Sequence, residues 1–469
     1  MTQGRRPGAS QSNSASCDAR PYFFLRGCAS QSGLVDTAAA SRLTLRKRVS
    51  GIDAFRSIFS LGTMTTDLRS GFFAPRMSRF KASPSQLAAV KVRELIAQGH
   101  DIVKFTAGEP DFPTPDLAKA AARAIMEAND IRYTPVNGTV EMRKAIQHKF
   151  RRDNGLEFAL DEIAVGSGTK QVLFNALMAT ISAGDEVVIP APYWTSYPDM
   201  VQLAGGTPVI VPCPQAQGFK ISPEMLDAAM TDRTKWFLFS SPSNPTGAVY
   251  SATELSALAE VLLAHPHVHV LSDDVYEHLV FDGRRFATLA SVEPRLAERT
   301  VTCNGVSKAY SMTGWRIGFA GGPKDLISQM SKMQSQSASS TSAVSQAAAS
   351  AVLLGPLDYV RERTANLQRR RDILHAGFNE IPGLRCDLPE GAMYLYCSCE
   401  AFMGKRTPEG KTIENDTDFT NYLLDAAGVS VVQGSAYGLS PFFRASFVAP
   451  EADLTRGAQR MRVACNALS

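Results

Sequence analysis

The chain has 469 residues, of which 44% are hydrophobic, so it can bury a large core and by length fits two or three domains. Its formal charge of +4 is small for this length, and much of the basic excess lies in residues 1–76, which hold eleven Lys or Arg against four Asp and no Glu. The remaining chain is near neutral, which disfavours nucleic-acid binding, and no apolar run reaches the roughly 18 residues of a membrane span.

Residues 1–76 are rich in Ser, Arg and Ala and contain only short apolar patches. Such a segment cannot bury enough apolar surface to offset the entropy of ordering, so we expect a disordered extension. Two origins stay open: an organelle transit peptide, which is typically Arg-rich and acid-poor, or a reading frame whose true start is Met64 or Met77. The second origin, which we favour, predicts a cytoplasmic protein, and the first an organellar one.

From residue 85 onward, amphipathic helical patterns alternate with short apolar runs of strand length. Helices are expected over residues 86–98 and 357–379 and from Glu451 to the end. The expected strands cover residues 101–106, 162–165, 186–189, 208–211, 235–239, 267–271, 299–303, 393–397, 429–432 and 443–447. The alternation predicts an α/β fold in which helices cover both faces of a largely parallel sheet.

The same pattern suggests two domains after the extension. Residues 116–356, with most of the alternation, are expected to form the large domain. Residues 77–115 and 357–469, where a long helix precedes shorter strands, are expected to form a smaller α/β domain packed on it.

Eight cysteines are scattered through the chain without the paired spacing of a metal site. They lie at positions 17, 28, 213, 303, 386, 397, 399 and 465. This usage suits a reducing compartment, and we interpret Cys397 and Cys399 as strand packing.

Ligands of open α/β sheets bind beyond the carboxyl ends of the strands, so the residues that follow each expected strand are candidates for a site. Residues 166–171 (GSGTKQ) follow one strand and open a helix whose free amides and dipole suit a phosphate. Gln171 stands where a dinucleotide fingerprint needs its third glycine. A single phosphate therefore fits better than a dinucleotide.

Other polar clusters have simpler explanations beside the functional ones. Residues 240–247 (SSPSNPTG) could be only a turn, and Asp273 and Asp274 only a helix cap. Three histidines alternate over residues 265–269, but Pro266 lies among them and no carboxylate is near in sequence. We therefore predict no metal site.

Lys308 lies directly after an expected strand, in small and apolar surroundings without an acidic neighbour. An isolated lysine is usually a solvated surface charge. A desolvated lysine near another cation, here Arg316, keeps its amine free to form a Schiff base with an aldehyde. Residues 304–318 (NGVSKAYSMTGWRIG) resemble the pyridoxal 5'-phosphate attachment site of the class I aminotransferases.

A second stretch, residues 244–247 (NPTG), resembles another motif of the same family, and the matches continue in order over residues 78–468. The resemblance implies the PLP-dependent transferase fold type I, with pyridoxal 5'-phosphate as cofactor. It also implies a homodimer with shared active sites. Within the family the chain is most similar to the bacterial-type aspartate aminotransferases, some of which also accept prephenate.

The resemblance assigns catalytic roles to three residues. Lys308 would carry the cofactor and move the substrate proton. Asp273 would bind the ring nitrogen, because a protonated ring is the better electron sink. Tyr276 would hydrogen-bond the phenolic oxygen of the cofactor.

The resemblance also implies the remaining contacts to cofactor and substrate. The further cofactor contacts would be Asn244 at the phenolic oxygen, Trp194 stacked on the ring, and Gly168, Thr169, Arg316 and Tyr133 at the phosphate. Tyr133 would reach from the neighbouring subunit, and Trp194 could instead be a core residue. The substrate contacts would be Gly108 in the N-terminal loop, Trp194, Asn244, Arg444 as clamp of the α-carboxylate, and Lys170 and Ser85 near the side-chain carboxylate.

Three observations concern how the substrate and the phosphate would be bound, and the last two are departures from the family pattern. Residues 334–350 contain no arginine, which the animal and enteric subgroup uses for the side-chain carboxylate, so Lys170 would take that task. Ser85 stands where threonine is usual, and Gly305 where many relatives have a phosphate-binding serine. Phosphate contacts are then expected from Thr169, Arg316, Tyr133 and backbone amides.

The implied reaction is ping-pong transamination between L-aspartate and 2-oxoglutarate, with prephenate and arogenate as a further substrate pair. Three alternatives stay open: an aminotransferase for neutral or aromatic amino acids, another enzyme of this fold such as a carbon–sulfur lyase, and a ligand-sensing regulator. Fold alone does not settle the reaction. The regulator would need a DNA-binding domain, and no helix-turn-helix pattern is visible.

Overall fold

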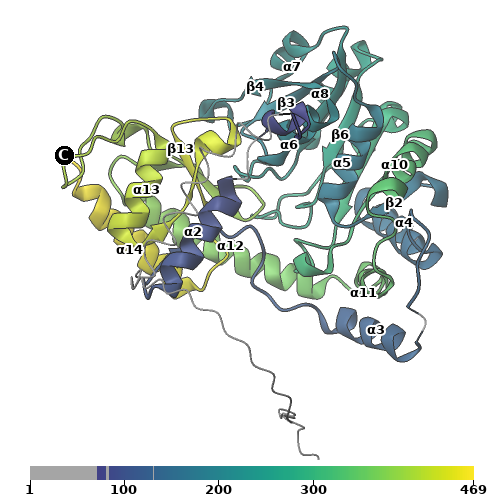
Figure 1. Cartoon of the computed structure of the whole chain (residues 1–469), viewed down its shortest axis with the longest axis horizontal. Coiled ribbons are helices and arrows are strands. Elements are labelled where there is room, and N and C mark those ends of the chain that lie inside the picture. The colour runs from purple at the N-terminus through teal and green to yellow at the C-terminus, as the bar shows by residue number, and fades with distance from the viewer. Residues whose placement is uncertain (1–70, 81–83, 130) are drawn as a thin grey trace, which may run out of the picture. The chain divides into compact units, whose positions relative to one another are not determined.

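Seven strands form the largest sheet of the protein (Figure 1). The computed structural model describes residues 71–80, 84–129 and 131–469, with the backbone alone at residues 84–89. The strand order is β2-β8-β7-β6-β5-β3-β4. The strands are Ile163–Gly166 (β2), Glu186–Ala191 (β3), Thr207–Pro212 (β4), Thr234–Ser240 (β5), His269–Asp273 (β6), Thr300–Gly305 (β7) and Gly318–Gly321 (β8). All neighbouring pairs are parallel except those of β8, which runs antiparallel to β2 and β7.

Helices cover both faces of this sheet, as the alternating pattern predicts. One face packs on α5 (Thr169–Thr180), α6 (Ser196–Ala204) and α10 (Lys324–Ser337), and Trp236 and Leu238 of β5 point to it. The next residues along β5, Phe237 and Phe239, join the opposite core with α7 (Pro223–Ala229) and α8 (Ala252–Ala264). Farther along that opposite face lie α3 (Asp116–Glu127), α4 (Val140–Asn154) and α11 (Ala343–Leu354). Strands buried on both faces explain why the sequence shows continuous apolar runs.

A second group of elements packs around smaller sheets. Four antiparallel strands follow the order β12-β13-β10-β9, and β1 pairs in parallel with β11. Their bounds are Val103–Lys104 (β1), Arg385–Cys386 (β9), Tyr394–Ser398 (β10), Val429–Ser430 (β11), Val432–Gln433 (β12) and Phe442–Ser446 (β13). The helices α12 (Asp358–Asn379), α13 (Asp416–Ala427) and α14 (Glu451–Asn466) share one core with these strands. The division of residues 77–469 into a large and a small domain stays a prediction.

Every strand expected from the sequence overlaps an observed strand, whereas β8 and β9 were not expected. β8 has the sequence GFAG, and glycine has a low strand propensity. β9 has only two residues, which is too short for a periodic signal. The expected first, long and last helices correspond to α2 (Pro84–Ala97), α12 and α14.

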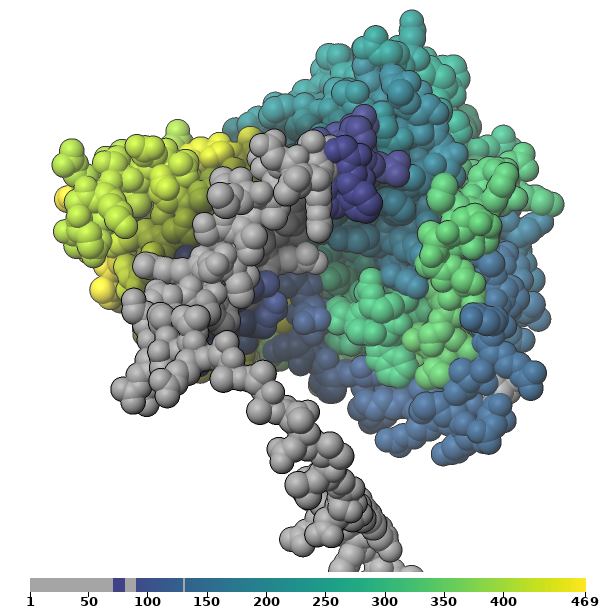
Figure 2. Space-filling model, in the orientation of Figure 1, coloured from purple at the N-terminus to yellow at the C-terminus, as the bar shows by residue number. Residues whose placement is uncertain are grey.

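The N-terminal end of the described chain lies on the surface. Residues Pro75–Ser78 form a short 3-10 helix that contacts α6, and Figure 2 shows residues 71–80 in purple over this part of the molecule. The expectation that residues 1–76 are disordered falls almost entirely outside the described residues. None of the described helices combines the length and the apolarity that a membrane crossing requires.

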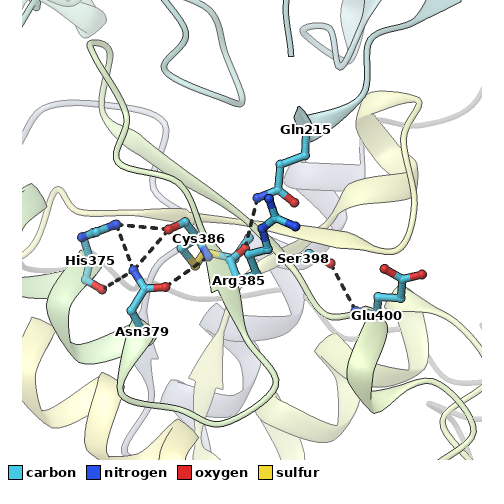
Figure 3. Close-up of a disulfide and its surroundings, with 8 residues drawn as sticks. Gln215, His375, Asn379, Arg385, Cys386, Ser398 and Glu400 are labelled. Carbon is cyan, nitrogen blue, oxygen red and sulfur yellow. Dashed lines mark hydrogen bonds between the residues drawn. A yellow bond between two sulfur atoms is a disulfide. The ribbon is translucent and has the colours of Figure 1, made fainter. Parts of the chain in front are cut away.

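Cys386 and Cys397 form a disulfide between neighbouring strands β9 and β10 (Figure 3). The two residues are register partners, with their Cα atoms 4.3 Å apart. His375 and Asn379 of α12 hydrogen-bond the Cys386 carbonyl at 3.1 and 3.2 Å. The interpretation of Cys397 as simple strand packing is therefore corrected, and the pair counts against a reducing compartment. The pairing depends on the register of β9, a strand that the sequence did not indicate.

The remaining described cysteines are buried free thiols, at positions 213, 303, 399 and 465. Cys399, which follows β10, is thus packed as expected.

Candidate active site

A cavity of about 570 Å³ lies at the carboxyl edge of the seven-stranded sheet. Parallel strands bring the ends of β5, β6 and β7 to this edge, and the start of α5 lies beside them. Ten of the residues singled out in the sequence line it: Gly108, Thr169, Lys170, Trp194, Asn244, Asp273, Tyr276, Lys308, Arg316 and Arg444. The fold therefore brings together residues that are up to 336 positions apart, from Gly108 to Arg444.

Lys308 follows β7 and is half buried in the cavity. Its Nζ atom donates a hydrogen bond to the carbonyl oxygen of Gly108 at 2.5 Å and lies 5.8 Å from the centre of the Tyr276 ring. Among the described residues, no carboxylate forms an ion pair with it. The amine is thus held at the cavity by one neutral acceptor, which a ligand can replace.

Asp273 ends β6 and is only 5% exposed. The hydroxyl of Tyr197 donates to its Oδ2 atom at 2.7 Å, while its Oδ1 atom has no hydrogen-bond partner within the described part of the chain. Burial raises the pKa of Asp273 to about 6, against the hydrogen bond from Tyr197, which lowers it. A buried carboxylate with a free oxygen is costly unless a donor meets it. The cavity therefore presents an acceptor that suits an N–H group of a ligand.

Glycines at the ends of three strands let α5 begin close to the sheet. Gly318 is the register partner of both Gly166 and Gly305. A Cβ atom on Gly318 would lie 2.1 Å from the backbone nitrogen of Thr169, and one on Gly305 would lie 2.6 Å from the Thr169 hydroxyl. The replacement of a family serine by Gly305 thus accompanies a direct approach of Thr169.

The first turn of α5 and Arg316 form a cationic corner of the cavity. The N-cap residue Gly168 has a φ of 89°, and a Cβ atom there would lie 2.3 Å from Nη2 of Arg316. That nitrogen donates to the carbonyl of Ser167 at 3.1 Å. Free amides at a helix start, together with a guanidinium group, favour a phosphate.

The hydroxyl of Thr169 has a different partner from the one expected. It donates to the Asn304 carbonyl at 3.0 Å, so its proton is engaged within the protein. An anion at this corner would then meet the backbone amide of Thr169 rather than its hydroxyl proton.

Arg444 of β13 is 4% exposed and faces the cavity. It donates to Oδ1 of Asn244 and to the carbonyl of Thr106, both at 3.1 Å. Its Nε atom has no hydrogen-bond partner in the described residues. The guanidinium fork is therefore oriented, with capacity left for a carboxylate.

Lys170 and Trp194 lie together at the rim. The Nζ atom of Lys170 is 4.7 Å from the centre of the Trp194 ring. Partial burial lowers the pKa of Lys170, Arg316 lowers it further, and Asp199 opposes them. A cation at an aromatic face beside the cavity is placed to attract an acidic group.

Three expected site residues lie outside this lining. Gly168 borders the cavity through Thr169 and Arg316. Tyr133 is 93% exposed, so its contact with a neighbouring subunit stays a prediction. Ser85 lies in the first turn of α2, and its side chain is outside the described residues.

Sequence reasoning missed two tyrosines of the cavity. The Tyr394 hydroxyl lies 2.9 Å from that of Tyr276, and Tyr197 bonds Asp273 as described above. Tyr197 lies three residues after Trp194, which places both on one side of a helical turn and was a usable signal. Tyr394 had no such signal, because its contacts depend on the meeting of two sheets.

Glu277 and His278, which follow Tyr276 in the sequence, belong to a buried network of charged residues. Asp153, Glu277 and His278 form the one group of the described residues with metal-like spacing, but Lys149 already forms an ion pair with Glu277. Glu277 and Asp153 raise the pKa of His278 to about 9, so it is also cationic. The expectation that three histidines alternate on one strand is wrong, because β6 begins at His269, and His265 and His267 precede it. His265 hydrogen-bonds Asp227 at 2.8 Å.

Comparison with known proteins gives one family. The family model described as aminotransferase class I and II matches residues 100–461. An aspartate aminotransferase of Rhizobium meliloti (strain 1021) is 50% identical over 409 residues, which are 87% of this chain and 100% of the relative. An aspartate/prephenate aminotransferase of Cereibacter sphaeroides is 51% identical over 85% of this chain and 100% of its own length.

Solved structures agree with this result. The crystal structure of the Rhizobium meliloti aspartate aminotransferase has a TM-score of 0.83 and 51% identity, over 85% of this chain and 99% of that one. The Thermus thermophilus aspartate aminotransferase with maleate has a TM-score of 0.78 and 37% identity, over 84% and 99%. The predicted fold type is therefore confirmed.

Proposed function

The chain belongs to the class I and II aminotransferases, and from that premise we propose that it transfers the amino group of L-aspartate to 2-oxoglutarate with pyridoxal 5'-phosphate as cofactor. The observation that carries the proposal is the meeting in one cavity of the amine Lys308, the buried acceptor Asp273 and the oriented guanidinium of Arg444. The two relatives named above bear aspartate in their names, which supports the choice of substrate.

The described residues fit pyridoxal 5'-phosphate at three points. The free Oδ1 atom of Asp273 suits a protonated ring nitrogen, and the corner of Thr169 amide and Arg316 suits a phosphate. The Nζ atom of Lys308 is available for a covalent bond with an aldehyde. When bound, the cofactor supplies that aldehyde and an electron-accepting ring, which together make the α-proton of an amino acid acidic.

The protein residues bind the substrate and move protons. Arg444 binds the α-carboxylate with its planar fork, and the Asn244 contact keeps that fork in place. Lys308 would take the proton from the α-carbon of the bound amino acid as general base and then deliver it as general acid. Asp273, held by Tyr197, would accept a hydrogen bond from the protonated ring nitrogen. Repetition with a 2-oxo acid in the reverse direction completes the ping-pong cycle.

Lys170 supports an acidic substrate. No described carboxylate pairs with it by a hydrogen bond or ion pair, and it faces the cavity beside Trp194. Glu109, an acid of the same lining, accepts a hydrogen bond from Thr313 at 2.8 Å and is thereby held beside Thr313. The side-chain carboxylate of aspartate would lie near Lys170.

A set of half-reactions tests the proposal. The purified holoenzyme is mixed separately with L-aspartate, L-glutamate, arogenate and L-alanine, and the conversion of the cofactor absorbance is timed. Fast conversion with aspartate and glutamate supports the proposal, and conversion with arogenate adds the substrate named for the Cereibacter sphaeroides relative. Faster conversion with alanine would overturn the substrate, and release of pyruvate and ammonia without an oxo acid would overturn the reaction.

We also propose that the enzyme is a homodimer. Tyr133 is 93% exposed, and the apolar side chains of Leu117, Ile131 and Leu354 are 43%, 52% and 56% exposed. A second copy of the chain that covers these side chains would bring Tyr133 of one subunit to the phosphate site of the other. The molar mass in solution tests this, and a monomer with full activity would overturn it. A cytoplasmic location stays a prediction, because it depends on residues 1–76 and because the disulfide between Cys386 and Cys397 counts against it.

A further inference from the structure

Tyr394 joins the two parts of the cavity wall. It is the first residue of β10, in the four-stranded sheet, and is 1% exposed. Tyr276, its partner, follows β6 of the seven-stranded sheet. Their hydroxyl oxygens are 2.9 Å apart, and the rings meet edge to face at 79°. One hydrogen bond thus connects two separate sheets beside the ligand cavity.

The ring of Tyr394 also supports Arg444. Tyr394 pairs with Ser446 and Tyr396 pairs with Arg444 across β10 and β13, so Tyr394 and Arg444 are diagonal neighbours on one face. The guanidinium carbon of Arg444 lies 4.2 Å from the centre of the Tyr394 ring. At that distance a buried cation is attracted to the aromatic face.

We propose that Tyr394 is a positioning residue that fixes the Tyr276 hydroxyl and the Arg444 guanidinium relative to each other. The inference rests on the proposed function, in which Tyr276 faces the cofactor and Arg444 the substrate carboxylate. The hydroxyl and the ring of Tyr394 have different roles. The hydroxyl acts on the cofactor side through Tyr276, and the ring acts on the substrate side through Arg444.

The hydroxyl pair has a defined direction once a ligand oxygen is present. Burial, and then the neighbouring Tyr394, hold the pKa of Tyr276 well above its ordinary value, so its hydroxyl keeps its proton. Tyr276 can donate that proton to the phenolic oxygen and accept one from Tyr394. A donor that itself accepts a hydrogen bond donates more strongly. Tyr394 therefore strengthens the contact of Tyr276 without touching the cofactor oxygen.

Two variants separate the hydroxyl from the ring, and a third is a matched control. Tyr394→Phe removes the hydroxyl and keeps the ring. Tyr394→Leu removes both. Tyr396→Phe removes a hydroxyl from the same face of β10, where it donates to the carbonyls of Leu439 and Gly434 at 2.8 and 3.2 Å, away from Tyr276.

Each holoenzyme is examined by pH titration of the cofactor absorbance and by the half-reaction with L-aspartate. For Tyr394→Phe we expect the pH midpoint of the cofactor absorbance change to rise by about half a pH unit, because a weaker hydrogen bond from Tyr276 competes less with the proton that titrates. KM for L-aspartate should change by less than about twofold. For Tyr394→Leu we expect KM for L-aspartate to rise about tenfold in addition. Tyr396→Phe should match the wild type in both.

An unchanged midpoint in Tyr394→Phe overturns the role of the hydroxyl, and the same KM in Tyr394→Leu overturns the role of the ring. If Tyr394→Leu does not fold, Tyr394→Phe still decides the first point, and Tyr394→Met, which also lacks an aromatic face, replaces it for the second. Failure of the proposed function would show itself differently. In that case the wild-type protein would have no cofactor absorbance or no reaction with L-aspartate.

Discussion

The floor and the rim of the cavity are held by the fold in different ways. Asp273, Asn244 and Thr169 form the floor, lie at or just beyond strand ends, and are 5%, 7% and 9% exposed. Lys170, Gly108 and Glu109 form the rim and are exposed. Floor residues are fixed by sheet register and packing, whereas rim residues can adjust to a ligand. The difference suggests that the floor determines which reaction occurs and the rim which substrate is accepted.

Lys308→Ala is the most severe test of this comparison, because Lys308 projects from the floor toward the rim. The variant should lose turnover by about four orders of magnitude or more, since Lys170, the other amine of the described lining, lies at the rim against Trp194 rather than beside Tyr276. Cofactor binding should persist through Asp273 and the Arg316 corner. Steady-state rates and equilibrium dialysis measure the two effects. Ordinary activity in the variant would contradict the assignment.

Asp273→Asn tests whether the buried carboxylate of Asp273, in the cavity floor, lowers the free energy of unfolding. The folded-state pKa of Asp273, about 6, lies above its ordinary value of 3.8, so folding favours the protonated form. The stabilisation of the folded state by the protonated Asp273 carboxyl is fully present below pH 3.8 and is lost as the pH rises through about 6. Without cofactor, the wild type should therefore be destabilised at pH 8, by about 3 kcal/mol relative to a neutral side chain.

The matched control for this prediction is Asp274→Asn. Asp274 is also buried, and its pKa is raised to about 7, but it does not line the cavity. Both variants should raise the melting temperature of the cofactor-free protein at pH 8. Only Asp273→Asn should weaken cofactor retention. Equal retention in the two variants would count against the role of Asp273.

Lys170→Ala tests the rim, and its effect should be smaller and selective. We expect kcat/KM for aspartate to fall about 30-fold, which is the range of one charge-assisted hydrogen bond, with little change for alanine. Lys170→Arg, which keeps the charge, should recover most of the loss. Steady-state kinetics with both donors measure this. Equal losses on acidic and neutral donors would mean that Lys170 serves the fold rather than specificity.

Most residues of the cavity floor could be predicted from the sequence. Fewer of the residues that hold the cavity residues in position could be predicted. Asp273 and Thr169 lie within four residues of the ends of expected strands, so strand prediction alone brings them to one edge. Tyr394 could not be predicted, because its contacts depend on the register of β10 with β13 and on how two sheets meet. The Cys386 to Cys397 pairing was missed for the same reason.

Tyr197→Phe is the mildest change, and it tests whether the floor is set by contacts that a ligand never touches. Its hydroxyl lowers the pKa of Asp273, so the variant should have a higher pKa there, by about half a unit to one unit. The pH at which cofactor affinity falls on the acid side should rise by the same amount. Tyr193→Phe, in the same segment but not among the described contacts of Asp273, is the control. If both variants behave like the wild type, Asp273 is ionised by its ligand alone, and the floor needs no support from α6.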